Sequence, residues 1–144
     1  MSNFELPGFN KIKNCRFGPM LYNPNDTHIG KSLDLYGEYC REETLLFDQL
    51  LKDGDIVLDV GAHMGAHSVY FAGKVGPKGG VLAFEPQRVL YQILCANVAL
   101  NSFLNVYAYN IALGQEKDFI KVPQLSYERE TNFGLFTPKD YNQG

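Results

Sequence analysis

Residues 55–86 read DIVLDVGAHMGAHSVYFAGKVGPKGGVLAFEP, and the other segments of the chain are best understood from them. An apolar run that ends at Asp59 comes first, and a second apolar run ends at Glu85. The stretch holds in order an apolar run, a glycine turn, a helical segment and the second apolar run, at residues 56–58, 61–65, 68–75 and 81–84. Continuously apolar strands are typical of parallel sheets covered on both faces. We therefore expect a β-α-β unit in an α/β protein with helices on both faces of a parallel sheet.

The glycine spacing bears on the kind of ligand. A dinucleotide fingerprint needs G-x-G-x-x-G, but residue 63 is His, so the turn reads D-x-G-x-x-x-G over Asp59, Gly61 and Gly65. Small residues let a ligand approach the backbone, and Glu85 is placed to accept both hydroxyls of a ribose. This pattern resembles the S-adenosylmethionine pocket of class I methyltransferases. The alternatives are a glycine-rich turn in another α/β protein, and a nicotinamide-dependent reductase, which the spacing disfavours.

Composition limits the classes of partner. The 144 residues suit one domain, but they are short for a complete doubly wound sheet. Thirteen basic residues face 16 acidic ones, and no basic cluster marks a nucleic-acid surface. The apolar runs are too short to span a membrane. Three cysteines without a C-x-x-C pair are typical of a reduced, cytoplasmic protein. We expect no nucleic-acid or membrane partner and a cytoplasmic location.

Further elements follow from turn signals and periodicity. We expect a hairpin at residues 15–22 and a helix at 41–52. A second helix is expected at 86–101 and a third strand at 105–113. Asn97 lies on the apolar stripe of the second helix, where a structural amide is the favoured interpretation. If the strands lie in the order 3-2-1, Asn110 and Ala112 end beside Glu85, near an adenine. Glu85 also has a purely structural interpretation, as a cap of the helix beginning at Pro86.

The order of the segments NDTHIGKSLDLYGEY, GDIVLDVGAHMGAHSVYFAGKVGPKGGVLAFEPQ, LYQILCANVALN, NVYAYNIALG and NFG resembles the FkbM family of S-adenosylmethionine-dependent methyltransferases. The resemblance covers residues 26–135 and implies a Rossmann-like class I enzyme that O-methylates a hydroxyl of a sugar or other small metabolite. It places the turn around the methionine part of the cofactor and Glu85 on the ribose. Tyr36 and Glu38 would close over the cofactor. The implied cofactor-binding residues are Tyr36, Glu38, Asp59, Gly61, Ala62, His63, Gly65, Glu85, Pro86, Asn110 and Ala112.

The sequence departs from this family in two ways. Position 63 is His where the family usually has Asn, and the later strands with their D-x-E-G-type motif are absent. The chain therefore looks like the cofactor-binding half of such an enzyme, with a lead-in and hairpin over 1–40 and an incomplete binding domain over 41–144. An incomplete sheet leaves an open edge, so we expect the chain to self-associate, to cover the edge with its own C-terminal tail, or to be marginally stable. We also expect little turnover by these residues alone. A catalytically silent cofactor-binding module is the alternative.

No catalytic residue can be assigned from the sequence. His63, His67 and Glu38 are candidate general bases, and nothing in the sequence ranks them. The i, i+4 spacing of His63 and His67 also suits a metal, but no third ligand lies nearby in sequence, so we expect none.

Overall fold

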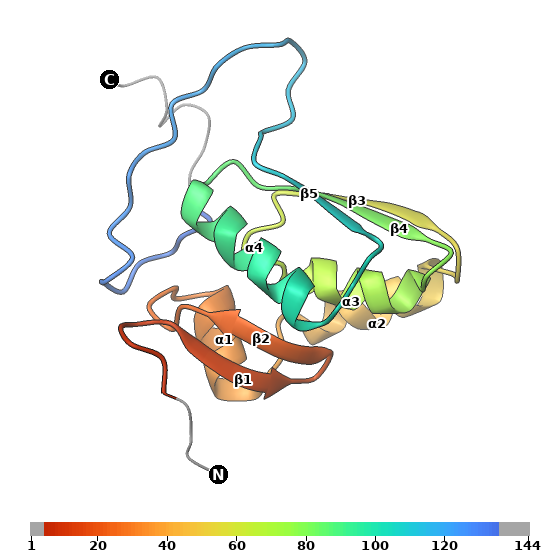
Figure 1. Cartoon of the computed structure of the whole chain (residues 1–144), viewed down its shortest axis with the longest axis horizontal. Coiled ribbons are helices and arrows are strands. Elements are labelled where there is room, and N and C mark those ends of the chain that lie inside the picture. The colour runs from red at the N-terminus through yellow and green to blue at the C-terminus, as the bar shows by residue number, and fades with distance from the viewer. Residues whose placement is uncertain (1–4, 136–144) are drawn as a thin grey trace.

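The structure is a computed structural model that describes residues 5–135 (Figure 1). An antiparallel hairpin is formed by β1 (Lys11–Cys15) and β2 (Gly18–Tyr22), with Cys15 opposite Gly18. The hairpin predicted at 15–22 is confirmed, although its first strand begins earlier than expected. Gly18 has φ +131° at the turn, a backbone conformation that a residue with a side chain rarely adopts.

The second sheet has three parallel strands in the order β3-β4-β5, which confirms the β-α-β unit and the 3-2-1 strand order. The helix α3 (Ala66–Val75) connects the first two strands, and α4 (Arg88–Leu100) connects the second and third. The strands are β3 (Ile56–Val60), β4 (Gly80–Phe84) and β5 (Val106–Tyr109). The third strand is thus shorter than the range 105–113 predicted for it.

Helices cover only one face of this sheet in the described residues, and Figure 1 shows α3 and α4 on the same side. Val81 and Ala83 are buried toward the helices, whereas Leu58 is 60% exposed on the opposite face. The expectation of helices on both faces is therefore wrong for these residues. Right-handed crossovers that keep stepping in one direction along a sheet must place successive helices on the same side.

Two predicted helices, α2 (Arg41–Leu50) and α4, are present with different ends, and a third helix, α1 (Ile29–Tyr36), was not predicted. The helix α2 has Glu42 and Glu43 in its first turn, where the helix dipole favours acids. Gly37 ends α1 with φ +68° and donates its N–H to the Leu33 carbonyl. The helix α4 begins at Arg88 rather than at residue 86, because Gln87 is still extended.

Asn97 joins the hairpin to the Rossmann-like part of the chain. Its Oδ1 accepts the backbone N–H of Leu21 at 2.6 Å, and its Nδ2 donates to the carbonyls of Leu21 at 2.9 Å and Met64 at 2.7 Å. The side chain is fully buried between β2, α4 and the loop after β3. The predicted structural role of this amide is confirmed.

Two further findings concern the cysteines and the helices. Cys15, Cys40 and Cys95 are all free thiols. Within residues 5–135, none of the helices has both the length and the apolar character that crossing a bilayer requires.

We predict that Asn97→Ala lowers the free energy of unfolding by about 2–4 kcal/mol, because it leaves buried backbone groups of two elements without partners. Urea unfolding of the variant measures this loss. Gln92→Ala, at an exposed position of the same helix, is the control and should change stability by less than about 0.5 kcal/mol. Equal effects of the two substitutions would show that the amide does not tie the hairpin to the core.

Candidate functional site

The loop between β3 and α3 is held at the carboxyl end of the sheet by backbone bonds. The N–H groups of Gly61 and Ala62 both donate to the Phe84 carbonyl at 2.9 Å. Gly61 and Gly65 have φ values of +80° and +86°. A Cβ at Gly61 would meet no atom within 4 Å, whereas one at Gly65 would lie 2.7 Å from Leu94 Cδ1. Gly61 thus borders open space, while Gly65 lets the loop pack against α4.

A cavity of about 230 Å³ lies beside this loop. Residues from α1, the start of α2, the end of β3, the loop and α3 line it. They are Ile29, Tyr39, Glu43, Asp59, Gly61, Ala62, His63, Ala66 and His67. The cavity brings together four residues of the predicted cofactor site. It adds Tyr39, Glu43 and His67. Of these three, the sequence indicated a possible functional role only for His67, through its i, i+4 spacing from His63.

Asp59 is the penultimate residue of β3 and lies at the wall of the cavity. Ser68 Oγ donates a hydrogen bond to its Oδ2 at 2.5 Å. The side chain is half-buried, and desolvation raises the pKa of its carboxyl above the ordinary value, more than the Ser68 hydrogen bond lowers it. In its ionised form this carboxylate would stabilise a cation or a hydrogen-bond donor in the cavity.

His63 has φ +55° and is held inside the protein. Its side chain is 8% exposed, and its Nε2 lies 3.9 Å from Asp26 Oδ2. Burial lowers the pKa of His63 to about 4, although the charge of Asp26 acts in the opposite direction. Its Nδ1 is buried without a hydrogen-bond partner among the described residues. Buried nitrogens normally have a partner, so this one is an exception.

Glu85 fastens the loop to the start of α4. Its Oε2 accepts the His63 backbone N–H and its Oε1 accepts the Gln87 N–H, both at 2.8 Å. The residue is 3% exposed, and desolvation raises its pKa more than these two bonds lower it. Glu85 thus has a structural role, but not the predicted one, because α4 begins at Arg88 and its start has no side-chain cap hydrogen bond. A carboxylate has about four acceptor positions, so these two bonds leave capacity for further donors.

Asn110 follows β5 and reaches back to the end of β4. Its Nδ2 donates to the carbonyls of Glu85 at 2.8 Å and Pro86 at 3.1 Å. The predicted adjacency of these strand ends is thus present in the structure. Ala112 lies in exposed coil beyond them.

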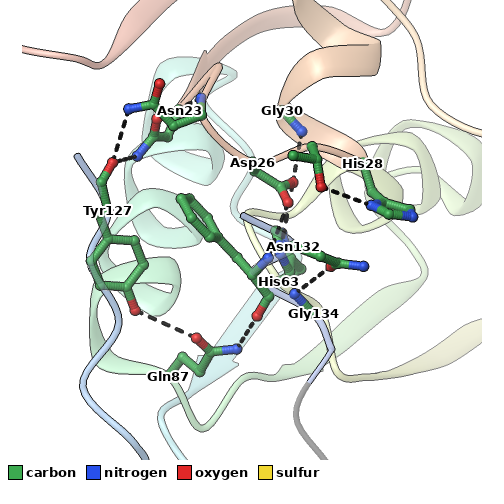
Figure 2. A network of polar contacts seen from close by, with 12 residues as sticks. Asn23, Asp26, His28, Gly30, His63, Gln87, Tyr127, Asn132 and Gly134 are labelled. Atoms are coloured by element: carbon green, nitrogen blue, oxygen red, sulfur yellow. Dashed lines mark hydrogen bonds and ion pairs between the residues drawn. The ribbon is translucent and has the colours of Figure 1, made fainter. Parts of the chain in front are cut away.

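Residues 127–134, here called the C-terminal strap, run across the outside of this region (Figure 2). Asn23 Nδ2 donates to the Tyr127 carbonyl at 2.8 Å, and Gln87 Nε2 donates to the Phe133 carbonyl at 2.6 Å. Asp26 Oδ1 accepts the Phe133 N–H at 3.2 Å, while its Oδ2 accepts the Gly30 N–H at 2.8 Å. The strap therefore joins the segment before α1 to the start of α4, next to His63. These contacts could not be placed from the sequence.

Tyr36 and Glu38 do not line the cavity. Tyr36 is 74% exposed at the end of α1. Glu38 is bound by Arg16 at 3.1 Å and has Arg41 at 3.9 Å. Their roles in holding a cofactor, like those of the other predicted site residues, stay predictions. Within the described ranges the structure forms no group of three or more His, Cys, Asp or Glu side chains suited to a metal ion.

We predict that His63 makes the fold less stable in acid. Above about pH 6.5 the imidazole is neutral in both the folded and the unfolded chain, so its contribution to stability is complete. Between about pH 6.5 and the folded pKa of about 4, the unfolded chain binds the proton first, and stability falls by on the order of 3 kcal/mol. Asp59 and Glu85, whose pKa values are raised, act with the opposite sign.

Urea unfolding of the parent and of His63→Asn from pH 7.5 to pH 4 isolates this contribution. Asn adopts positive φ readily, so it keeps the backbone and removes the titrating group. The stability of the variant relative to the parent should therefore rise as the pH falls. His28→Asn, at an exposed position, is the control and should follow the parent. Parallel pH profiles for His63→Asn and the parent would refute the prediction.

Comparison with known proteins supports the fold. No family model matches the chain. Over 55 residues it is 40% identical to "Methyltransferase sdnD" of Sordaria araneosa, a match that spans 38% of this chain and 21% of that protein. The structure is similar to a Pyrococcus horikoshii protein described as a transferase, with 19% identity, a TM-score of 0.56 and coverage of 72% of this chain and 37% of that one. It is also similar to Trm5b of Pyrococcus abyssi, with 17% identity, a TM-score of 0.54 and coverage of 73% and 29%.

The matched segment is thus about a fifth of the length of the curated relative. At identities below 20%, the likeness to solved structures establishes a shared fold. The described residues have a Rossmann-like α/β fold, with a parallel sheet of three strands.

Proposed function

We propose that this chain is the cofactor-binding part of an S-adenosylmethionine-dependent methyltransferase of the FkbM type, which O-methylates a hydroxyl of a sugar or other small metabolite. The observation that carries the proposal is the cavity at the glycine turn, with Asp59 at its wall. In open α/β sheets, ligands bind outside the carboxyl ends of the strands, where this cavity lies. The methyltransferase relative in Sordaria araneosa supports the same reaction class.

The residues present fit this cofactor. Asp59 and His63 line the cavity, and Asp59 offers a polar contact there. Glu85 is buried and does not line the cavity, but its carboxylate has acceptor positions beyond its two backbone bonds, which would suit ribose hydroxyls. When bound, adenosylmethionine supplies an electrophilic methyl group on a sulfonium sulfur, which becomes a neutral thioether once the methyl is transferred. The protein then has to position the acceptor oxygen and exclude water.

We propose an order among the three candidate bases for the acceptor's proton. Glu38 is committed to Arg16 and Arg41. The lowered pKa of His63 makes it a weak proton acceptor near neutral pH. His67 lines the cavity, and its Nε2 lies 3.3 Å from Glu43 Oε2. We therefore assign the proton-accepting role to His67.

The alternative is a catalytically silent module that binds the cofactor and transfers nothing. The uncovered sheet face favours it, since an acceptor pocket needs walls that these residues do not supply. A methyl-transfer assay with a panel of sugars and other small hydroxyl compounds separates the two functions. Transfer to any of them would exclude the silent module.

We predict that adenosylmethionine raises the melting temperature of the chain, whereas NAD and NADP do not. Glu85→Gln should weaken adenosylmethionine binding by about 10- to 100-fold, because hydroxyl donors lose a charged acceptor. The same change should also lower the stability without ligand, because one of the two backbone N–H groups then faces an NH₂ group. Calorimetry of the folded variant measures the affinity separately from the stability.

Glu116→Gln, at an exposed position, is the control for the change in charge and should bind like the parent. Unchanged affinity of a folded Glu85→Gln variant would leave Glu85 with its structural role alone. Stabilisation by NAD in place of adenosylmethionine would favour the reductase.

We also predict self-association through the uncovered part of the sheet. Among the described residues β3 has a neighbouring strand only on the β4 side, and Ile56, Leu58 and Val60 project from its exposed face. Sedimentation velocity at tens of micromolar should show dimers or larger species. Leu58→Lys should yield monomers, because it places a charge within the apolar face. Leu104→Lys, at an exposed position outside the strands, should sediment like the parent. A monomeric parent would contradict the prediction. The alternative, that the C-terminal tail covers the edge, concerns residues 136–144, which lie outside the described residues.

A further inference from the structure

The cavity at the glycine turn has a lining of one sign of charge. Glu43 comes from the first turn of α2 and Asp59 from the end of β3, and both line the space. None of the described residues that line it is a lysine or an arginine. His63 adds no positive charge near neutral pH, since its pKa is lowered to about 4 by burial. The walls therefore present two carboxylates that no lysine or arginine of the lining balances, and His67 lies beside one of them, Glu43.

A second observation indicates that a ligand belongs here. The His63 side chain is 8% exposed, it lines the cavity, and its Nδ1 has no hydrogen-bond partner among residues 5–135. The Nε2 of His67 is also buried and lies 3.3 Å from Glu43 Oε2 without hydrogen-bond geometry. Buried imidazole nitrogens are rarely left in this condition unless a partner is missing. The two acids thus lie beside two buried imidazole nitrogens that have no hydrogen-bond partner among the described residues.

We propose that Glu43 and Asp59 make this cavity selective for charge, so that it binds the positively charged adenosylmethionine more tightly than its neutral product S-adenosylhomocysteine. The inference rests on the proposed function and adds to it a basis for product release. The two compounds differ by one methyl group and one positive charge, and they share the adenosine and amino-acid parts. A difference in affinity between them therefore reports on the field at the sulfur and on little else.

The physical basis is the low-dielectric setting of the two carboxylates. Asp59 is half-buried, so its charge is screened less than that of a surface acid. Glu43 is half-exposed, and its contribution is correspondingly smaller. The Tyr39 ring also lines the cavity, and an aromatic face attracts an onium cation. All three contributions are lost when the ligand loses its charge, and the neutral product is then held less tightly.

Titration calorimetry at about pH 8 and low ionic strength tests the inference. At that pH imidazoles are generally neutral. The ligands are adenosylmethionine, adenosylhomocysteine and sinefungin, an analogue in which a charged amine replaces the sulfonium. We expect the parent to bind adenosylmethionine about tenfold more tightly than adenosylhomocysteine. Sinefungin should bind like adenosylmethionine.

Glu43→Gln should weaken binding of the two cationic ligands about threefold and leave adenosylhomocysteine unchanged. Glu42→Gln is the matched control. It makes the same change in the same first turn of α2, but Glu42 does not line the cavity. Its affinities should equal those of the parent. Added salt should reduce the preference for cations, because the carboxylates are partly screened.

Each other result has a clear meaning. If the parent binds adenosylhomocysteine as tightly as adenosylmethionine, the charge selectivity is wrong while the proposed function stands. A tenfold preference that Glu43→Gln and Glu42→Gln alter equally would also overturn the inference, since it would exclude a local effect of Glu43. If neither nucleoside binds to a folded parent, the proposed function fails as well.

Discussion

The geometry of the site depends on the two hydrogen bonds that the Glu85 carboxylate makes to backbone N–H groups. One bond holds His63 in the loop after β3, and the other holds Gln87 before α4. Without them, two buried amides would lack acceptors, and the loop and the helix would lose their common anchor. The cost of burying a carboxylate is visible in its raised pKa. The buried carboxylate fixes the backbone at His63 and Gln87, at the carboxyl end of the sheet.

Local patterns sufficed to predict the central β-α-β unit, the hairpin and the order of the parallel strands. These features follow from apolar runs, glycine turns and the handedness of crossovers, all of which are short-range or general rules. The structural role of Asn97 was also predictable, because a lone amide on an apolar helical stripe must find partners inside the protein. The helix α1 was missed because its start has no side-chain cap, and the nearby Asp26 carboxylate bonds to Gly30 instead.

Contacts between distant segments set the limit of prediction. The strap depends on Asp26 receiving the Phe133 N–H, and on Gln87 donating to the Phe133 carbonyl. Neither contact leaves a periodic or compositional trace, because one backbone group bonded to one side chain does not repeat along the chain. Glu43 escaped prediction for a related reason: its place in the first turn of α2 already had a sufficient local explanation in the helix dipole.

The uncovered face and the cavity have a common origin in the strand order. Each crossover here steps in the same direction, so both helices fall on one side, and the cavity forms where that side meets the carboxyl end of β3. Covering the other face requires a reversal of strand order, which places later helices opposite the first ones. The walls built by these residues therefore surround one side of a ligand. On that side, Glu43 and Asp59 give the cavity wall a negative charge, and this holds for any structure that encloses the other side of the ligand.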